Sequence, residues 1–219
     1  MIKEKSSEVS REAQTWLVVG LGNPGSRYAR HRHNVGFHFI DALKDKCREL
    51  NLLQDKPRYT LWRGMLPHSE SVSQSRKGVF YRVLLMKPLT FMNLSGPPVG
   101  HVAHFYKIPL QNILVVHDEL ALQLGQVRFK KGGGAAGHNG LKSLDGVLGQ
   151  GYCRLRIGIG HPGLKEAVTG HVLGNFTQDE SQEISALAER MCSLFSLLLQ
   201  GNSSLFTTKL ALLKDVPPS

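Results

Sequence analysis

The clearest hydrophobic pattern in the chain is a set of short, continuous apolar runs that end at glycine or polar residues. Trp16–Val19 leads into Gly20, and Ile113–Val116 leads into His117. Such runs are typical of strands buried on both faces of a parallel sheet. Two further strands are predicted at Tyr59–Trp62 and Val79–Met86.

Helical periodicity separates these runs. A helix is predicted from Val35, with Asn34 as its N-cap and one apolar face: Phe39, Ile40, Leu43, Cys47 and Leu50. Pro97-Pro98 is expected to begin a second helix, over residues 97–107. Thr177–Glu180 has the form of a capping box, and Gly201 is the expected end of the helix that follows it.

In two further segments apolar and polar residues alternate, as they do in strands with one exposed face. They are Gln126–Lys131 and Arg154–Gly160, and in the second Arg154 and Arg156 would lie on the exposed side. Because strands alternate with helices, we expect an α/β fold: a single three-layer α/β/α domain with a mixed, largely parallel central sheet. It would span residues 16–219, after a flexible polar arm at 1–15 and with an extended insert at 67–78.

Composition and charge narrow the function. With 27 Lys and Arg against 17 Asp and Glu, the 219-residue chain has a formal net charge of +10, which favours a polyanionic partner. No apolar run approaches the roughly 20 residues of a membrane helix, so no membrane association is expected. Three cysteines without a CxxC pair indicate a reducing compartment, and we expect a cytoplasmic monomer.

Polar residues follow three of the predicted strands. Asn23, the run Phe91–Asn93 and Asp118 would meet at the carboxyl edge of the sheet, where open α/β sheets place their sites. Two more polar segments, Arg30–Asn34 and Gly137–Gly140, border a helix start and a glycine run. A neutral His can accept a proton from water, an Asp can orient and stabilise that His, and Asn amides can donate to an oxyanion. This set of groups predicts base-assisted hydrolysis.

Six segments in this order resemble the bacterial-type peptidyl-tRNA hydrolase family. The matching segments are Val18–Gly25 with Tyr28, Arg32–Asn34, Thr90–Gly96, His117–Leu120, Gly132–Lys142 and Arg154–Pro162. The resemblance runs from about Leu17 to the C-terminal helix. It implies an enzyme that hydrolyses the ester between a peptide and the 3′ ribose of tRNA, with peptidyl-tRNA as its partner and no cofactor.

The resemblance also implies roles for individual residues. His33 would be the base, Asp118 its support and Asn23 the group that reads the peptide backbone, with Asn93 completing the catalytic set. The remaining matches to the substrate cleft are Tyr28, Phe91 and Asn139. Ala135-Ala136 inside the glycine run departs from the family pattern and puts only peripheral contacts in doubt.

Basic residues gather around the glycine run. They are Arg128, Lys130, Lys131, Lys142, Arg154 and Arg156. Ordinary solvated strand and helix faces would explain them, but their clustering favours contacts to RNA phosphates.

When the residues are considered without the family resemblance, other functions remain open. Gly20, Gly22 and Gly25 satisfy the dinucleotide fingerprint, but Pro24 removes an amide from that loop and Asp41 lies inside a helical pattern. The histidines show no strong ligand spacing such as HExxH, so we expect no metal. No nucleophile motif is present, so water is the expected attacker. The main alternative to the enzyme is a non-catalytic RNA-binding relative, although such a protein would not need a complete acid–base set.

Overall fold

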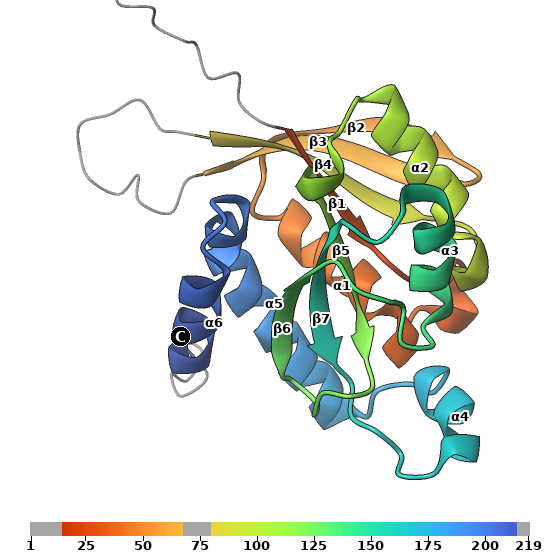
Figure 1. Cartoon of the computed structure of the whole chain (residues 1–219). Helices are drawn as coiled ribbons and strands as arrows, with labels where there is room; N and C mark the ends of the chain where they lie inside the picture. The colour runs from red at the N-terminus through yellow and green to blue at the C-terminus, as the bar shows by residue number, and fades with distance from the viewer. Residues whose placement is uncertain (1–14, 68–79, 214–219) are drawn as a thin grey trace, which may run out of the picture.

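The computed structural model describes residues 15–67 and 80–213 of the chain (Figure 1). The polar arm expected at 1–15 lies outside the described residues except for Thr15, and so does the expected insert except for Pro67. No helix in the described ranges is long and apolar enough to cross a membrane.

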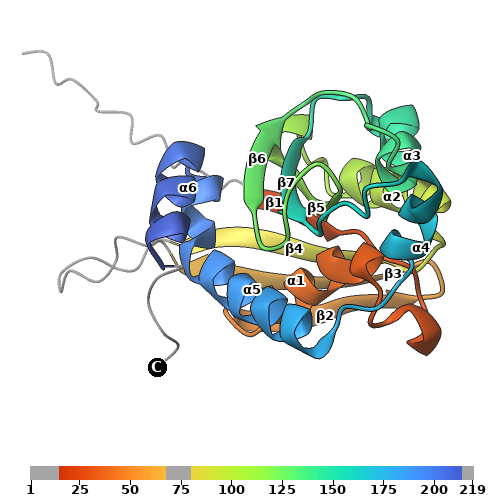
Figure 2. The ribbon, with the colours of Figure 1, turned by 90° about the horizontal axis from the view of Figure 1, so that it is seen from below.

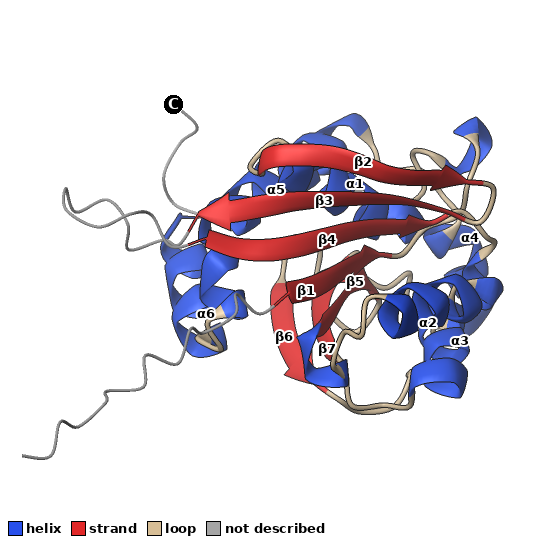
Figure 3. Ribbon diagram, turned by 90° about the horizontal axis from the view of Figure 1, so that it is seen from above, coloured by secondary structure: helices blue, strands red, loops and turns tan. Residues whose placement is uncertain are grey.

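A seven-stranded mixed sheet forms the centre of the fold, in the order β2-β3-β4-β1-β5-β7-β6 (Figure 3). The strands are β1 (Thr15–Gly20), β2 (Arg48–Lys56), β3 (Tyr59–Pro67), β4 (Phe80–Pro88), β5 (Ile113–Glu119), β6 (Val127–Lys131) and β7 (Cys153–Gly158). The four central strands β4, β1, β5 and β7 are parallel to one another, and the pairs β2–β3, β3–β4 and β6–β7 are antiparallel. The expected mixed sheet with a parallel centre is confirmed.

Helices cover both faces of this sheet and make three layers (Figure 2). The helices are α1 (Val35–Lys44), α2 (Gly96–Phe105), α3 (Asn139–Leu148), α4 (Val168–Val172), α5 (Gln178–Leu199) and α6 (Ser203–Leu212). One core joins the sheet to α1, α5 and α6, with Phe39, Phe195 and Phe206 fully buried. The other joins the opposite face to α2 and α3, around Leu17, Val115 and Tyr152. Strand positions alternate between the two cores because successive side chains point to opposite faces.

The capping box predicted at Thr177–Glu180 is present. Thr177 Oγ1 accepts from the Glu180 amide, and Glu180 Oε2 accepts from the Thr177 amide. The helix that it opens, α5, ends at Leu199, before Gly201 with φ +80°.

The prediction for the first helix was wrong at its end. The helix stops at Lys44, and Leu50 belongs to β2. Cys47 and Leu50 still pack against the core that they were expected to join, but from a turn and a strand. Strand β2 is a largely exposed edge strand whose register with β3 shifts twice, so its apolar residues do not alternate regularly.

Helix α1 lies unusually close to the sheet. A Cβ atom added at Gly36 would be 2.4 Å from the Val116 carbonyl oxygen, and one at Gly20 would be 2.2 Å from the Gly36 carbonyl oxygen. No residue but glycine fits either position without moving backbone atoms. This contact sets how close the residues just before α1 come to the end of β5.

We therefore expect glycine-to-alanine substitutions in α1 and α3 to change the free energy of unfolding in opposite directions. Gly36→Ala should destabilise the protein by about 1–3 kcal/mol, because backbone on both sides must move apart. Gly146→Ala in α3, where a Cβ meets nothing within 4 Å, should stabilise it by about 0.5–1 kcal/mol. Urea unfolding of the two variants measures both. Equal effects in the two helices would contradict the close contact.

Candidate active site

His33 and Asp118 form a buried hydrogen-bonded pair at the carboxyl edge of the sheet. His33 lies on a short 3-10 turn, Arg32–Asn34, that leads into α1, and Asp118 is the sixth residue of β5. His33 Nδ1 is 2.9 Å from both Asp118 oxygens, and the two residues are 9% and 4% exposed. A carboxylate can only accept, so Nδ1 carries a proton, and in the neutral ring Nε2 then keeps its lone pair. This is the tautomer that a general base requires.

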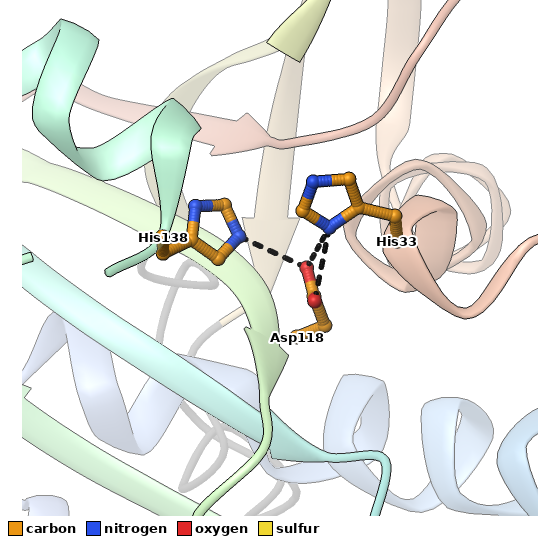
Figure 4. Close-up of side chains that lie close together, drawn as sticks. All are labelled: His33, Asp118 and His138. Atoms are coloured by element: carbon orange, nitrogen blue, oxygen red, sulfur yellow. Dashed lines mark hydrogen bonds and ion pairs between the residues drawn. The ribbon is translucent and has the colours of Figure 1, made fainter. Parts of the chain in front are cut away.

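A second histidine, His138, binds the other side of the same carboxylate (Figure 4). Its Nε2 is 3.0 Å from Asp118 Oδ1, and its ring centroid is 4.9 Å from that of His33. His138 is also the N-cap of α3, where its Nδ1 accepts from the amides of Gly140 and Leu141. Since Nδ1 is an acceptor, Nε2 must be the donor, and a second proton would face two backbone N–H groups. The cap therefore fixes His138 as a neutral donor to Asp118.

These contacts keep the carboxylate charged. Burial alone would raise the pKa of Asp118, but the His33 and His138 rings and their hydrogen bonds hold the pKa well below its ordinary value. Beneath them lies His117, fully buried, with Nδ1 2.7 Å from the Asp118 carbonyl oxygen. Burial, and then His138 beside it, lowers the pKa of His117 to about 3, so this ring is neutral.

Asn23 is tied to the turn that carries His33. The Asn23 amide donates to Asn34 Oδ1 at 3.0 Å, and Asn34 Nδ2 donates to the Asn23 carbonyl at 2.8 Å. Asn34 was expected to cap α1, but its side chain makes no capping hydrogen bond and is used here instead. Asn23 Oδ1 accepts from the Met92 amide at 2.8 Å, which leaves its Nδ2 to donate. The loops after β1 and β4 and the His33 turn are thus one hydrogen-bonded unit.

The other predicted cleft residues lie on the elements around this unit. Tyr28 and Phe91 contact edge to face, with ring centroids 6.1 Å apart, and Phe91 is 54% exposed. Asn93 is exposed on the 3-10 turn after β4 and Asn139 is exposed at the start of α3. These two elements touch, since a Cβ added at Gly140 would lie 2.5 Å from Met92 Sδ. Neither Asn93 nor Asn139 contacts Asp118.

A cleft of about 330 Å³ opens beside the two histidines. His33, Asp118, His138 and Asn139 form its polar wall. Glu119 and Leu120 at the end of β5 also line it. The glycine run on one side and helix α4 on the other complete it, through Ala135–Gly137, Val168, Thr169, Val172 and Leu173. The cleft is therefore polar at the bottom and mostly apolar along its sides.

The predicted basic patch divides into two kinds of residue. Arg128, Lys130, Lys131 and Lys142 are exposed, and within the described part of the chain none of them has an acidic partner. Arg156 is half-buried, and its Nε lies 2.8 Å from Glu119 Oε2.

The expected exposure of Arg154 was wrong, since it is 2% exposed. Its guanidinium donates to the carbonyl oxygens of Gly133 and Gly134 and pairs with Asp145 at 3.4 Å. The glycine run folds over this side chain, so Arg154 holds the loop in place.

His33, Asp118 and His138 also offer three possible metal-ligand atoms within 4.8 Å. Their N–O distances of 2.9–3.0 Å are those of hydrogen bonds, and the cap already occupies His138 Nδ1. Hydrogen bonding explains this arrangement without an ion, and the expectation of no metal stays a prediction.

Sequence reasoning noticed the segment Gly137–Gly140 but gave His138 no role. The available signal was its place after a glycine run, where a tight turn brings the next residues back to the sheet edge. A histidine as N-cap is not among the preferred capping residues, so its capping could not be anticipated.

Comparisons with known proteins agree on one family. The family described as peptidyl-tRNA hydrolase matches residues 17–214. The chain is 46% identical to the peptidyl-tRNA hydrolase of Rhodospirillum centenum, over 92% of this chain and 83% of that protein, and 43% identical to that of Bartonella quintana, over 87% and 92%. A crystal structure of peptidyl-tRNA hydrolase from Acinetobacter baumannii superposes with a TM-score of 0.75 at 40% identity, covering 90% of this chain and 95% of that one.

The lowered pKa of Asp118 predicts how stability depends on pH. In the unfolded chain this carboxyl takes up a proton near pH 4, whereas in the fold it does so only at lower pH. Its contribution to the free energy of unfolding is therefore complete above about pH 4 and is lost as pH falls further. Urea unfolding of the native protein and of Asp118→Asn should give a difference in the free energy of unfolding that shrinks as pH falls below about 4. A difference that stays constant there would contradict the paired carboxylate.

Proposed function

The chain belongs to the peptidyl-tRNA hydrolase family, and from this membership we propose how its own residues hydrolyse the ester bond of peptidyl-tRNA. The observation that carries the proposal is the contact of His33 Nδ1 with both oxygens of Asp118, which leaves Nε2 free as a base.

The reaction begins with a water held by His33 Nε2. As the water oxygen attacks the ester carbonyl carbon, its proton passes to Nε2, and the imidazolium that forms is stabilised by Asp118. When the bond to the ribose 3′ oxygen breaks, the same proton returns to that oxygen. The second proton of the water stays on the new carboxyl group and is then lost to solvent. The products are a peptide with a free carboxylate, a released proton and a tRNA with a free 3′ hydroxyl.

His138 acts on Asp118 and not on the substrate. As a neutral donor it satisfies one carboxylate oxygen and holds the group in the orientation that meets His33. Its cap on α3 prevents it from competing for the proton of the attacking water, because its only remaining nitrogen already accepts two amides.

The asparagines supply neutral donors. Asn23 Nδ2 is fixed by the bond of its Oδ1 to Met92, and we assign it to the peptide carbonyl next to the ester. An amide there suits a blocked amino group better than a charged free one, which would favour peptidyl-tRNA over aminoacyl-tRNA. We assign Asn139, which lines the cleft, and Asn93, exposed on the turn after β4, to further contacts with the substrate. Tyr28 with Phe91 would offer an aromatic surface to the peptide.

The tRNA part of the substrate is assigned to the basic patch. Arg128 and Lys130 lie opposite Arg156 and Arg154 in the β6–β7 register and share one face of the sheet with them. Because Arg154 and Arg156 have acidic partners, the exposed charges of Arg128, Lys130, Lys131 and Lys142 remain for phosphates. We further propose that the protein works as a cytoplasmic monomer, a location that its three free cysteines suit.

The proposal for His33 predicts a large loss of turnover. His33→Ala should lower kcat on N-blocked aminoacyl-tRNA by roughly 10²–10⁴-fold, as expected for a missing general base, while tRNA binding persists. Release of free tRNA measures turnover. The matched control is His104→Ala, which removes an exposed histidine on α2 and should leave turnover unchanged. Near-normal turnover of a folded His33→Ala protein would rule out this base.

The proposal for the patch predicts a change in salt dependence. Lys130→Ala should weaken tRNA binding and flatten the plot of log K against log salt by about 0.7–0.9, the contribution of one neutralised phosphate. Arg156→Ala should flatten the plot less than Lys130→Ala, because Glu119 already pairs with the Arg156 charge. Arg63→Ala, an exposed residue of β3 in the opposite half of the sheet, is the control of equal charge. If all three variants flatten the plot equally, net charge and not the patch attracts tRNA.

A further inference from the structure

Arg32, the neighbour of His33, is a buried arginine that the proposed reaction does not use. Its side chain is 11% exposed, and among the described residues the hydrogen bonds of its guanidinium go to the segment from α4 to the first turn of α5. Nη1 donates to the Asn175 carbonyl at 2.7 Å, Nη2 pairs with Glu180 Oε2 at 2.6 Å, and the group lies 5.3 Å from the centre of the Phe176 ring. All of these partners are about 140 residues away in sequence.

Backbone hydrogen bonds also join the residues around Arg32 to the segment 174–176. The Arg32 amide donates to the Gly174 carbonyl at 3.0 Å, and the Phe176 amide donates to the Arg30 carbonyl at 3.3 Å. His31 and Asn175 form an isolated antiparallel bridge. The turn that carries His33 and the segment 174–176 therefore lie side by side, and the Arg32 side chain spans the contact.

Helix α4 depends on such polar contacts because it has little else to hold it. It is five residues long, none of them buried, and it lies beyond the carboxyl end of β7 (Figure 1). Among the described contacts of α4, Arg32 Nη1 donates to the His171 carbonyl at 3.4 Å, and the His171 ring hydrogen-bonds to the Ile159 carbonyl at 2.9 Å. A segment with so few buried apolar groups opens at low cost unless polar contacts fix it.

The position of α4 matters because it forms one wall of the cleft. Val168, Thr169 and Val172 face the cavity from the side opposite the glycine run. We infer that Arg32 is a positioning residue: by joining α4 to the His33 turn and to Glu180, it sets the wall against which the acyl group of the substrate lies. This inference rests on the cleft being the place where the ester is hydrolysed.

The arrangement explains why the residue is arginine. Glu180 Oε2 already accepts from the Thr177 amide in the capping box of α5, so its charge is fixed in place before Arg32 meets it. The planar guanidinium reaches a carboxylate and a carbonyl in two directions at once, which the single ammonium of lysine does not reproduce. Arg32 thus connects three elements: the turn before α1, the end of α4 and the start of α5.

Hydrogen exchange and kinetics on the full-length protein test the inference. Arg32→Met should speed amide exchange of Leu173, Gly174 and Phe176 by roughly 10–100-fold, the loss expected for charged hydrogen bonds, while β1 and β5 amides keep their rates. KM for N-blocked aminoacyl-tRNA should rise about tenfold with less than about a threefold change in kcat, because the wall contacts substrate and transition state alike. For Arg32→Lys, the exchange rates and KM should lie between those of the native protein and those of Arg32→Met.

Two further variants separate this role from others. Arg30→Met removes the same charge from an exposed side chain two residues away, and should change neither exchange nor KM. Glu180→Gln should reproduce part of the Arg32→Met effect, and the double variant should be no worse than Arg32→Met alone, as for two partners in one contact.

Three results would overturn the inference. Unchanged exchange at 173–176 would show that Arg32 does not hold α4. Faster exchange throughout the sheet would make it a residue of the fold in general. If Arg32→Met shifted the acidic limb of the pH–rate profile and left KM unchanged, Arg32 would act through His33 and not through the cleft wall. Should His33→Ala instead retain turnover, the cleft assignment falls, and the exchange rates alone still decide whether Arg32 holds α4.

Discussion

A buried carboxylate needs compensation, and the requirements of Asp118 shape the whole edge of the sheet. An ionised group with 4% exposure is costly to bury unless donors surround it. Its two ring donors come from a turn before α1 and from the first turn of α3, so two separate segments must converge on the end of β5. The close contact of α1 with the sheet and the cap of α3 are the means by which they do so.

In this arrangement Asp118 carries the negative charge, and only one of its two histidine neighbours can accept a proton. The carboxylate has two histidine neighbours, but only His33 keeps an unoccupied nitrogen, because backbone amides use the free nitrogen of His138. The two histidine side chains are chemically identical, and the fold distinguishes them because backbone amides bind the second ring nitrogen of His138 but not that of His33. The same principle applies to the arginines: Arg154 and Arg32 bind backbone carbonyls and carboxylates, while Lys130 stays exposed.

Much of this could be predicted from the sequence, and the exceptions have physical reasons. Buried parallel strands appear as continuous apolar runs, and polar residues after them meet at one edge, so β1, β5 and Asp118 were predictable. The role of His33, which precedes a helix, was predicted from the family resemblance. Strand β2 was not, because an irregular, exposed edge strand has no regular alternation of apolar residues. The burial of Arg154 and the role of His138 depend on how a glycine-rich loop folds back, and glycine permits too many conformations for spacing to specify one.

The strand order has a consequence for how the chain acquires this structure. Strand β7 follows β6 in sequence but lies between β5 and β6, so β6 has no partner in the sheet until β7 has entered. A chain synthesised only as far as residue 150 would hold Asp118 on a strand with one unpaired edge, a surface prone to association with other chains. Completion of the site is thus a late event in folding. The residues of the site, from Asn23 to Asn139, are thus all synthesised before β7 joins the strand that carries Asp118.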